Sequence, residues 1–246
     1  MRYFLKLAYH GKNYCGWQRQ ENAIAVQQVL EEKLQLVIGY PADITGCGRT
    51  DAGVHAHQYF AHFDVRDAIS DTELFIYKFN ALLPDSIAIY ACFPVVDDLH
   101  ARFSASSRSY KYFMHYGKNP FRDDFSFSLQ NKRPDIQLMN QCCRHLLGEY
   151  DFSTFEKKGS DNKTSVCNLT DAHFTETEDG IVFTITANRF LRNMVRRITG
   201  AMLMVGLNQL KSEELITLVR NQQTLNVKIA VPAKGLFLWE IIYPNF

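Results

Sequence analysis

Two different periodicities succeed one another along the first half of the chain. Apolar and polar positions alternate, as in a half-buried strand, over residues 1–9, 43–47, 54–65 and 86–96. Residues 25–38 instead carry apolar side chains at the spacing of one helix face. Ser70-Asp71-Thr72-Glu73 has the form of a capping box, which predicts a second helix from Ser70 to about Leu82. The predicted order is β-α-β-β-α-β.

The second half gives nearly the same order. Strands are predicted over residues 108–116, 164–175, 181–187 and 236–243, and helices over 135–147, 190–205 and 212–221. Two copies of a split β-α-β unit imply an α+β protein with antiparallel sheets and helices packed on one face. We therefore expect two pseudo-symmetric β-α-β-β-α-β (ferredoxin-like) halves, residues 1–100 and 101–246.

Composition narrows the class of protein. The 246 residues are 46% hydrophobic and 22% charged, which is ordinary for a globular protein. No apolar run approaches the roughly 18 residues of a membrane span, and the N-terminus lacks a signal-peptide layout, so no membrane partner is expected. The six cysteines form no Cys-x-x-Cys pair and are expected to be reduced thiols in a cytoplasmic protein.

The charge distribution says more than the net charge of +1. Two stretches, residues 101–120 and 181–211, contain basic residues and no acidic ones. Such stretches are often solvated faces, but two of them flanked by acidic segments also suit a polarised surface that binds a polyanion. Their basic residues are Arg102, Arg108, Lys111 and Lys118, and then Arg189, Arg192, Arg196, Arg197 and Lys211.

Residues 46–56, GCGRTDAGVHA, form a glycine-flanked connection between two predicted strands. Arg49 and Asp51 lie two positions apart on it, and flanking glycines allow close approach of a ligand. A plain turn is the alternative, because Gly and Asp suit turns. A phosphate-binding loop is excluded because Val54 stands where that motif needs Lys, and no helix opens here as a dinucleotide motif requires. Asp51 is the candidate catalytic carboxylate.

Five blocks, in order along nearly the whole chain, resemble the motifs of the tRNA pseudouridine synthase A family. They are GKNYCGWQRQ (11–20), GRTDAGVHA (48–56), HARFSA with RSYKY (100–105, 108–112), FLRNMVR (190–196) and PAKGLFL (232–238). Two departures concern substrate detail: His10 replaces a common acidic residue, and residues 58–60 read QYF where the family has GQV.

The resemblance implies a bacterial-type enzyme that isomerises uridine to pseudouridine at positions 38, 39 and 40 of the tRNA anticodon stem-loop. It further implies a central basic cleft between the halves and a homodimer. The reaction needs no metal and no organic cofactor, since nothing is oxidised or hydrolysed. The family's essential aspartate falls on Asp51. Whether Asp51 attacks the ribose, adds to the base or abstracts a proton stays open.

Further site residues follow from the same resemblance. Arg196 and Arg49 would hold the carboxylate ionised, and Arg49 would also hold the flipped nucleotide. Tyr110 would stack on the base, although it and Tyr112 share a strand face and could be core aromatics. Three more residues are expected in substrate binding: Arg102, Arg108 and Leu83, the last of which could equally be an ordinary helix end.

Other readings remain. His55 and His57 share a strand face, but without a third ligand they are expected to be structural and not metal-binding. A related pseudouridine synthase with a different RNA target fits the same motifs. A catalytically silent RNA-binding protein of the same fold is the alternative from another class, against which the intact Asp51 argues.

Overall fold

A computed structural model describes residues 1–157, 159, 163–225 and 229–244. The chain forms two compact units: unit 1 comprises Met1–Ser106 and Phe237–Phe246, and unit 2 comprises Ser107–Leu236. The described residues contain five α-helices and mostly antiparallel strand pairs, which confirms the predicted α+β class. Parallel pairs join β3 to β10 and β5 to β6.

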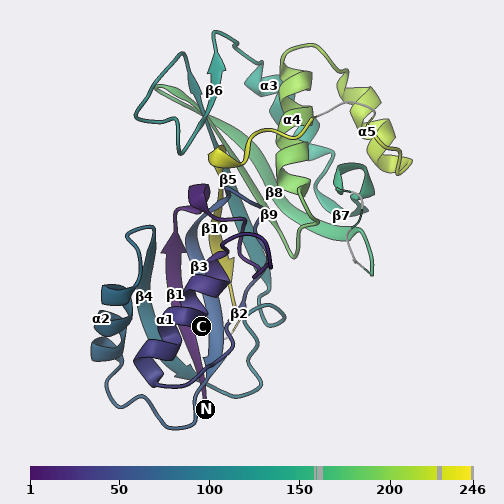
Figure 1. Ribbon diagram of the computed structural model, residues 1–246. Coiled ribbons are helices and arrows are strands. Elements are labelled where there is room, and N and C mark those ends of the chain that lie inside the picture. The colour runs from purple at the N-terminus through teal and green to yellow at the C-terminus, as the bar shows by residue number, and fades with distance from the viewer. Residues whose placement is uncertain (158, 160–162, 226–228, 245–246) are drawn as a thin grey trace. The chain divides into compact units, whose positions relative to one another are not determined.

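Unit 1 has the element order β-α-β-β-α-β (Figure 1). Its strands run β4-β1-β3, with β2 and β10 both paired to β3. Helices α1 and α2 lie over one face of these strands. The elements are β1 (Arg2–Tyr9), a 3-10 turn (Gly11–Asn13), α1 (Val26–Ile38), β2 (Thr45–Gly46), β3 (His55–Asp64), α2 (Thr72–Leu82), β4 (Ile87–Val95) and β10 (Leu236–Ile242).

Both faces of β1 carry buried side chains, since the consecutive residues Tyr3, Phe4 and Leu5 are all buried, whereas the predicted alternation would bury one face only. Helix α1 places Val26, Leu30 and Leu34, all fully buried, in the core of the unit. Phe4 points to the opposite face, where its ring meets Tyr243 edge-on at 5.6 Å. The C-terminal segment therefore closes the second face of the sheet in unit 1.

The cap of α2 differs from the prediction. Asp71, not Ser70, is the N-cap, and its side chain accepts a hydrogen bond from the Leu74 backbone N–H at 2.9 Å. The capping-box assignment to Ser70 was therefore wrong by one residue. An aspartate oxygen reaches the first-turn amides as well as a serine oxygen does, so the sequence alone offers two equivalent starts.

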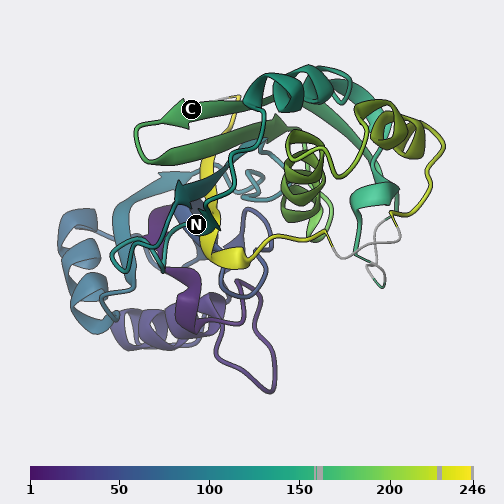
Figure 2. The same ribbon diagram turned by 90° about the horizontal axis from the view of Figure 1, so that it is seen from above.

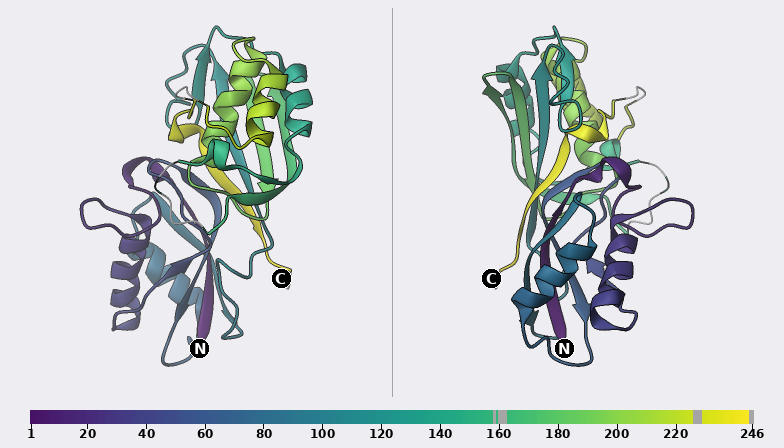
Figure 3. Two further views of the ribbon diagram at one scale, coloured as in Figure 1. Left: turned by 90° about the vertical axis from the view of Figure 1, so that its right-hand side faces the viewer. Right: turned by 60° about the vertical axis from the view of Figure 1, so that its left-hand side comes forward.

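Unit 2 pairs its strands in the order β6-β5-β9-β8-β7, with its helices on one face (Figures 2 and 3). The elements are β5 (Ser107–Tyr116), β6 (Phe127–Gln130), α3 (Ile136–Arg144), β7 (Gly148–Asp151), 3-10 turn Ser153–Phe155, β8 (Val166–Thr177), β9 (Gly180–Ala187), α4 (Met194–Gly206), α5 (Ser212–Arg220) and 3-10 turn Ala233–Gly235.

Three features of unit 2 differ from the sequence prediction. The short strands β6 and β7 were not predicted, because four residues are too few to establish a period. Helix α4 begins four residues later than expected, since Asn193 takes a left-handed backbone conformation with φ of 64° and interrupts the helical path.

The cysteines are all free thiols, and five of the six are buried. Burial raises the pKa of Cys92 to about 12 and that of Cys167 to about 11, so both stay protonated at neutral pH. Among the described residues, no helix combines the length and apolar character needed to cross a membrane.

Candidate active site

The loop that joins β2 to β3 exposes alternate side chains. Thr50 is buried, whereas Arg49 on one side of it is exposed and Asp51 on the other is half-buried. The loop closes on itself through a 3.1 Å hydrogen bond from the Val54 N–H to the Asp51 carbonyl. One inward anchor thus separates the two candidate functional side chains.

Buried aromatic residues hold this loop from below. The Tyr9 hydroxyl lies 2.8 Å from Thr50 Oγ1, and the Tyr59 hydroxyl donates to the Gly48 carbonyl. The Trp17 ring stacks on the Tyr59 ring with centroids 4.1 Å apart. Because Trp17 and Tyr59 are almost completely buried, this platform has little freedom to shift.

The N-terminal loop bonds to the same segment through its backbone. The Trp17 N–H donates to the Thr50 carbonyl at 3.3 Å, and the Gly53 N–H donates to the Tyr14 carbonyl at 3.2 Å. Gly16 has φ of 102°, and a Cβ there would lie 2.2 Å from the Thr50 carbonyl oxygen. Only glycine allows this close approach of two backbones.

A third segment, residues 83–86 after α2, joins this cluster. The His10 N–H donates to the Ser86 carbonyl at 2.8 Å, and the Tyr14 and Ser86 hydroxyls lie 2.7 Å apart. Leu83, expected in substrate binding, ends α2 and is buried, and its N–H bonds back to Phe79 and Asn80. Leu83 therefore packs in the apolar part of unit 1.

The two histidines of the loop exit differ in their surroundings. His55 is buried and accepts the Gly11 N–H on Nδ1 at 3.1 Å. His57 is exposed and stacks on Trp239 with ring centroids 4.1 Å apart. Within the described ranges, no three His, Cys, Asp or Glu side chains are grouped so as to hold a metal ion.

In unit 2, Arg108 and Tyr110 lie on β5. The Tyr110 ring is half-buried and meets the Phe190 ring edge-on, with centroids 5.1 Å apart and planes at 85°. Arg108 is half-buried, and its Nη1 donates to the Asn188 carbonyl at 2.9 Å. Both side chains are thus held against the segment that leads from β9 into α4.

Arg196 lies in the first turn of α4 and holds residue 231 through two hydrogen bonds. Its Nε donates to the Val231 carbonyl at 2.7 Å, and its own carbonyl accepts the Val231 N–H at 3.2 Å. The Tyr112 hydroxyl donates to the next carbonyl, that of Pro232, at 2.8 Å. Burial raises the pKa of Tyr112 against the opposing charge of Arg196, so the hydroxyl stays protonated and donates.

The candidate residues thus divide between the units. Unit 1 holds Asp51, Arg49 and Leu83, and unit 2 holds Arg108, Tyr110 and Arg196. Arg102 also lies in unit 1, where it is exposed with its guanidinium 5.5 Å from the Phe103 ring. The sequence did not identify the supporting residues Tyr9, Trp17 and Tyr59. Trp17 lies inside a recognisable block, but nothing local marks Tyr9 or Tyr59 as partners of the loop.

Comparison with known proteins adds to this geometry. A family model described as tRNA pseudouridine synthase matches residues 142–244. Curated relatives named tRNA pseudouridine synthase A match almost the whole chain. The protein from Parabacteroides distasonis is 44% identical over 99% of this chain and 96% of its own length. The one from Azobacteroides pseudotrichonymphae is 44% identical over 100% and 98%. That from Thermoanaerobacter pseudethanolicus is 36% identical over 96% of both.

Similarity of this extent places the chain in a known class of RNA-modifying isomerases. The chain belongs to the tRNA pseudouridine synthase A family.

Proposed function

We propose that this protein isomerises uridine to pseudouridine at positions 38, 39 and 40 of the tRNA anticodon stem-loop. The observation that carries the proposal is the loop of residues 47–53, in a chain that belongs to a family of tRNA pseudouridine synthases. Thr50 is anchored inward on Tyr9, and the carboxylate of Asp51 is left on the partly exposed side. A fixed carboxylate beside an exposed arginine suits chemistry on a bound nucleotide.

The reaction breaks the bond from uracil N1 to ribose C1′ and forms a bond from C5 to C1′. The C5 proton leaves and N1 gains one, so no atom or electron is lost and no cofactor is required. In the proposal Asp51 is the catalytic carboxylate, and Arg49 binds the flipped nucleotide beside it. Holding a catalytic group in the correct position relative to the substrate can contribute several kcal/mol to catalysis. The rigid support of the loop matters for this reason.

Unit 2 supplies the remaining proposed roles. Tyr110 stacks on the extruded uracil, and the Phe190 ring that meets it edge-on fixes its orientation. Arg196 presents a guanidinium whose Nε is already anchored on Val231. A side chain held at one nitrogen loses less entropy when it binds a further anion.

The proposal extends to tRNA binding. With the short strands β6 and β7 set aside, the order β5, α3, β8, β9, α4 repeats the order β1, α1, β2, β3, α2, and β5–β9 and β9–β8 pair as β1–β3 and β3–β2 do. This repeat supports two pseudo-symmetric halves, which we propose form a central basic cleft that includes Arg102 and Arg108. We also propose that the protein acts as a homodimer. Binding should weaken steeply with added salt, because phosphate contacts release counterions.

The test is pseudouridine formation by purified protein on tRNA, mapped by nucleotide. Asp51→Asn should lower the single-turnover rate by about a thousandfold or more while tRNA affinity changes little. Asp43→Asn, which removes an exposed carboxylate just before β2, is the matched control and should retain the wild-type rate. A wild type that binds tRNA without forming pseudouridine would support the catalytically silent alternative. Product outside positions 38 to 40 would support a different RNA target.

A further inference from the structure

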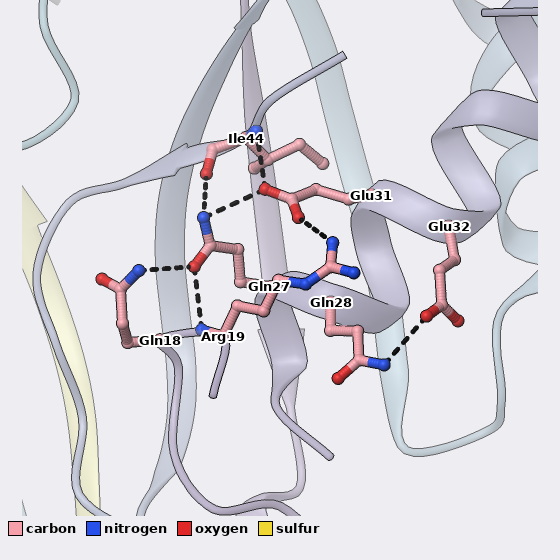
Figure 4. Close-up of polar contacts among 7 residues, drawn as sticks. All are labelled: Gln18, Arg19, Gln27, Gln28, Glu31, Glu32 and Ile44. Atoms are coloured by element: carbon pink, nitrogen blue, oxygen red, sulfur yellow. Dashed lines mark hydrogen bonds and ion pairs between the residues drawn. The ribbon is translucent and has the colours of Figure 1, made fainter. Parts of the chain in front are cut away.

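Gln27, on the first turn of α1, uses its whole side-chain amide to join two other segments. Its Nε2 donates to the Ile44 carbonyl and to Glu31 Oε1, both at 3.0 Å. Its Oε1 accepts from Gln18 Nε2 and from the Arg19 backbone N–H, again at 3.0 Å (Figure 4). One amide therefore connects α1 to the approach to β2 and to the N-terminal loop.

Glu31, one turn further along α1, joins the same two segments. Its Oε1 accepts the Ile44 N–H at 3.2 Å, and its Oε2 lies 3.2 Å from Arg19 Nη1. The Glu31 side chain is only 12% exposed, so these charge-assisted bonds are poorly replaced by water. The N–H and carbonyl of Ile44 are thus both satisfied by α1.

Ile44 needs these partners because of its place in the sheet. Strand β2 is only two residues long, and its pairing with β3 begins at Thr45. Ile44 is completely buried, and its N–H and C=O bond to Glu31 and Gln27. Gln27 and Glu31 act for Ile44 as a neighbouring strand would, and they fix where β2 and the following loop start.

A second connection from α1 to the loop runs through the N-terminal segment of residues 17–19. The Trp17 carbonyl accepts the Gln27 N–H at 3.0 Å, and the Trp17 N–H donates to the Thr50 carbonyl. The segment of Trp17, Gln18 and Arg19 is therefore held on α1, and its first residue holds Thr50. One route from α1 leads through Ile44 to the start of β2, and the other leads to Thr50, next to Asp51.

We propose that Gln27 and Glu31 are positioning residues for Asp51, whose loop their side chains hold in place through Ile44 and through Gln18 and Arg19, which follow Trp17 in the chain. The inference rests on the proposed function. Neither side chain touches the reacting atoms. A displacement of the carboxylate by about 1 Å is enough to lower a rate by up to a hundredfold, so a remote clamp can govern the chemical step.

The same helix supplies a matched control. Gln28 donates from Nε2 to Glu32 Oε1 at 2.9 Å, with the same two residue types at the same spacing one position along (Figure 4). In this second pair Gln28 is half-buried and Glu32 exposed, and the bond between them lies within the helix. Gln28→Ala removes a Gln–Glu pair from α1 without removing a bond to Ile44 or Arg19.

The experiment compares Gln27→Ala with Gln28→Ala in the full-length protein, on tRNA, at a temperature where circular dichroism shows both variants folded. At saturating enzyme the single-turnover rate of Gln27→Ala should fall by about tenfold to a hundredfold, with the tRNA dissociation constant within about threefold of wild type. The Gln28→Ala rate should stay within about twofold of wild type. Equal rates in Gln27→Ala and wild type would overturn the proposal, as would equal losses in both variants.

Glu31 separates positioning from a merely structural role. Glu31→Gln keeps an acceptor oxygen for the Ile44 N–H and should retain most of the rate, whereas Glu31→Ala should match Gln27→Ala. Amide exchange of residues 44–53 should accelerate in Gln27→Ala and not in Gln28→Ala. A wild type that forms no pseudouridine would refute the proposed function. If amide exchange of residues 44–53 were unchanged in Gln27→Ala, the positioning role of Gln27 would be refuted, whether or not the wild type forms pseudouridine.

Discussion

The hydroxyl of Tyr9, at the end of β1, lies 2.8 Å from Oγ1 of Thr50, the residue between Arg49 and Asp51. Both side chains are buried, with exposed fractions of 4% and 8%. A hydrogen bond in such surroundings is specific in geometry, because a movement of the loop would break it where water cannot readily replace it. The bond therefore sets the depth at which the loop sits on the sheet of unit 1.

Removing either side of this bond should destabilise the fold. Tyr9→Phe and Thr50→Val each remove this buried hydrogen bond, from the sheet side and from the loop side, so each should lower the free energy of unfolding by about 1 to 2 kcal/mol. The double variant should cost less than the sum, with a coupling of about 1 kcal/mol in a double-mutant cycle from urea unfolding. Tyr77→Phe, on an exposed tyrosine of α2, is the control. Strictly additive losses would contradict the bond.

Two glycines at the base of the loop should differ strongly in how much stability an alanine substitution costs. A Cβ at Gly46 would lie 2.1 Å from the Tyr59 hydroxyl and 2.5 Å from Trp17, both buried, whereas a Cβ at Gly48 meets nothing within 4 Å. Gly46→Ala should lower the free energy of unfolding by about 3 kcal/mol through overpacking, and Gly48→Ala by less than about 0.5 kcal/mol. Chemical denaturation of the two variants checks this. Similar losses of stability in the two variants would show that the Tyr59 and Trp17 side chains move to make room for the methyl group at position 46.

The protein should lose stability as the pH falls below neutrality, because of His62. Burial, followed by the positive charges of Arg2 and His100, lowers the pKa of His62 from 6.5 to about 4, with Asp64 opposing weakly. Between these values the unfolded chain binds a proton that the folded protein does not. Stability is therefore lost as the pH falls from about 6.5 to about 4, by about 2 to 3 kcal/mol.

The variant His62→Gln tests this pH dependence. It cannot take up the proton, so urea unfolding between pH 7 and pH 4 should show a shallower acid slope than in wild type. Its absolute stability will also change, because His62 Nδ1 accepts the Ala101 N–H at 3.1 Å. The slope is therefore the decisive quantity. An unchanged slope would assign the acid sensitivity to other groups.

Arg196, in the first turn of α4, and Arg192, two residues before that helix, should differ in kinetic effect when each is replaced. Arg196 is half-buried and anchored on Val231, whereas Arg192 is exposed. Arg196→Gln should lower the single-turnover rate by about a hundredfold and tRNA affinity much less. Arg192→Gln should weaken binding and reduce its salt slope by about 1 while the rate at saturation stays. Equal losses of rate and affinity in Arg196→Gln would reduce its role to phosphate binding.

Much of the fold was predictable because its elements are locally periodic. Helix α1 begins within one residue of the predicted start, since its apolar face repeats along thirteen residues. The errors occurred where local signals are short or equivalent. Strand β6 has four residues, and the caps Ser70 and Asp71 satisfy the same rule. The left-handed residue Asn193 delays α4 in a way that helix propensity does not indicate.

The sequence by itself determined the α+β class, the order of elements in unit 1 and, through its motif blocks, the family. These properties depend on neighbours a few positions apart. Only the tertiary structure decided that Tyr9 supports Thr50 and that Gln27 and Glu31 hold Ile44, contacts that span 41, 17 and 13 residues. Such partners are fixed by which strands pair and in what register. That choice minimises the free energy of the whole unit and leaves no mark on the residues nearby.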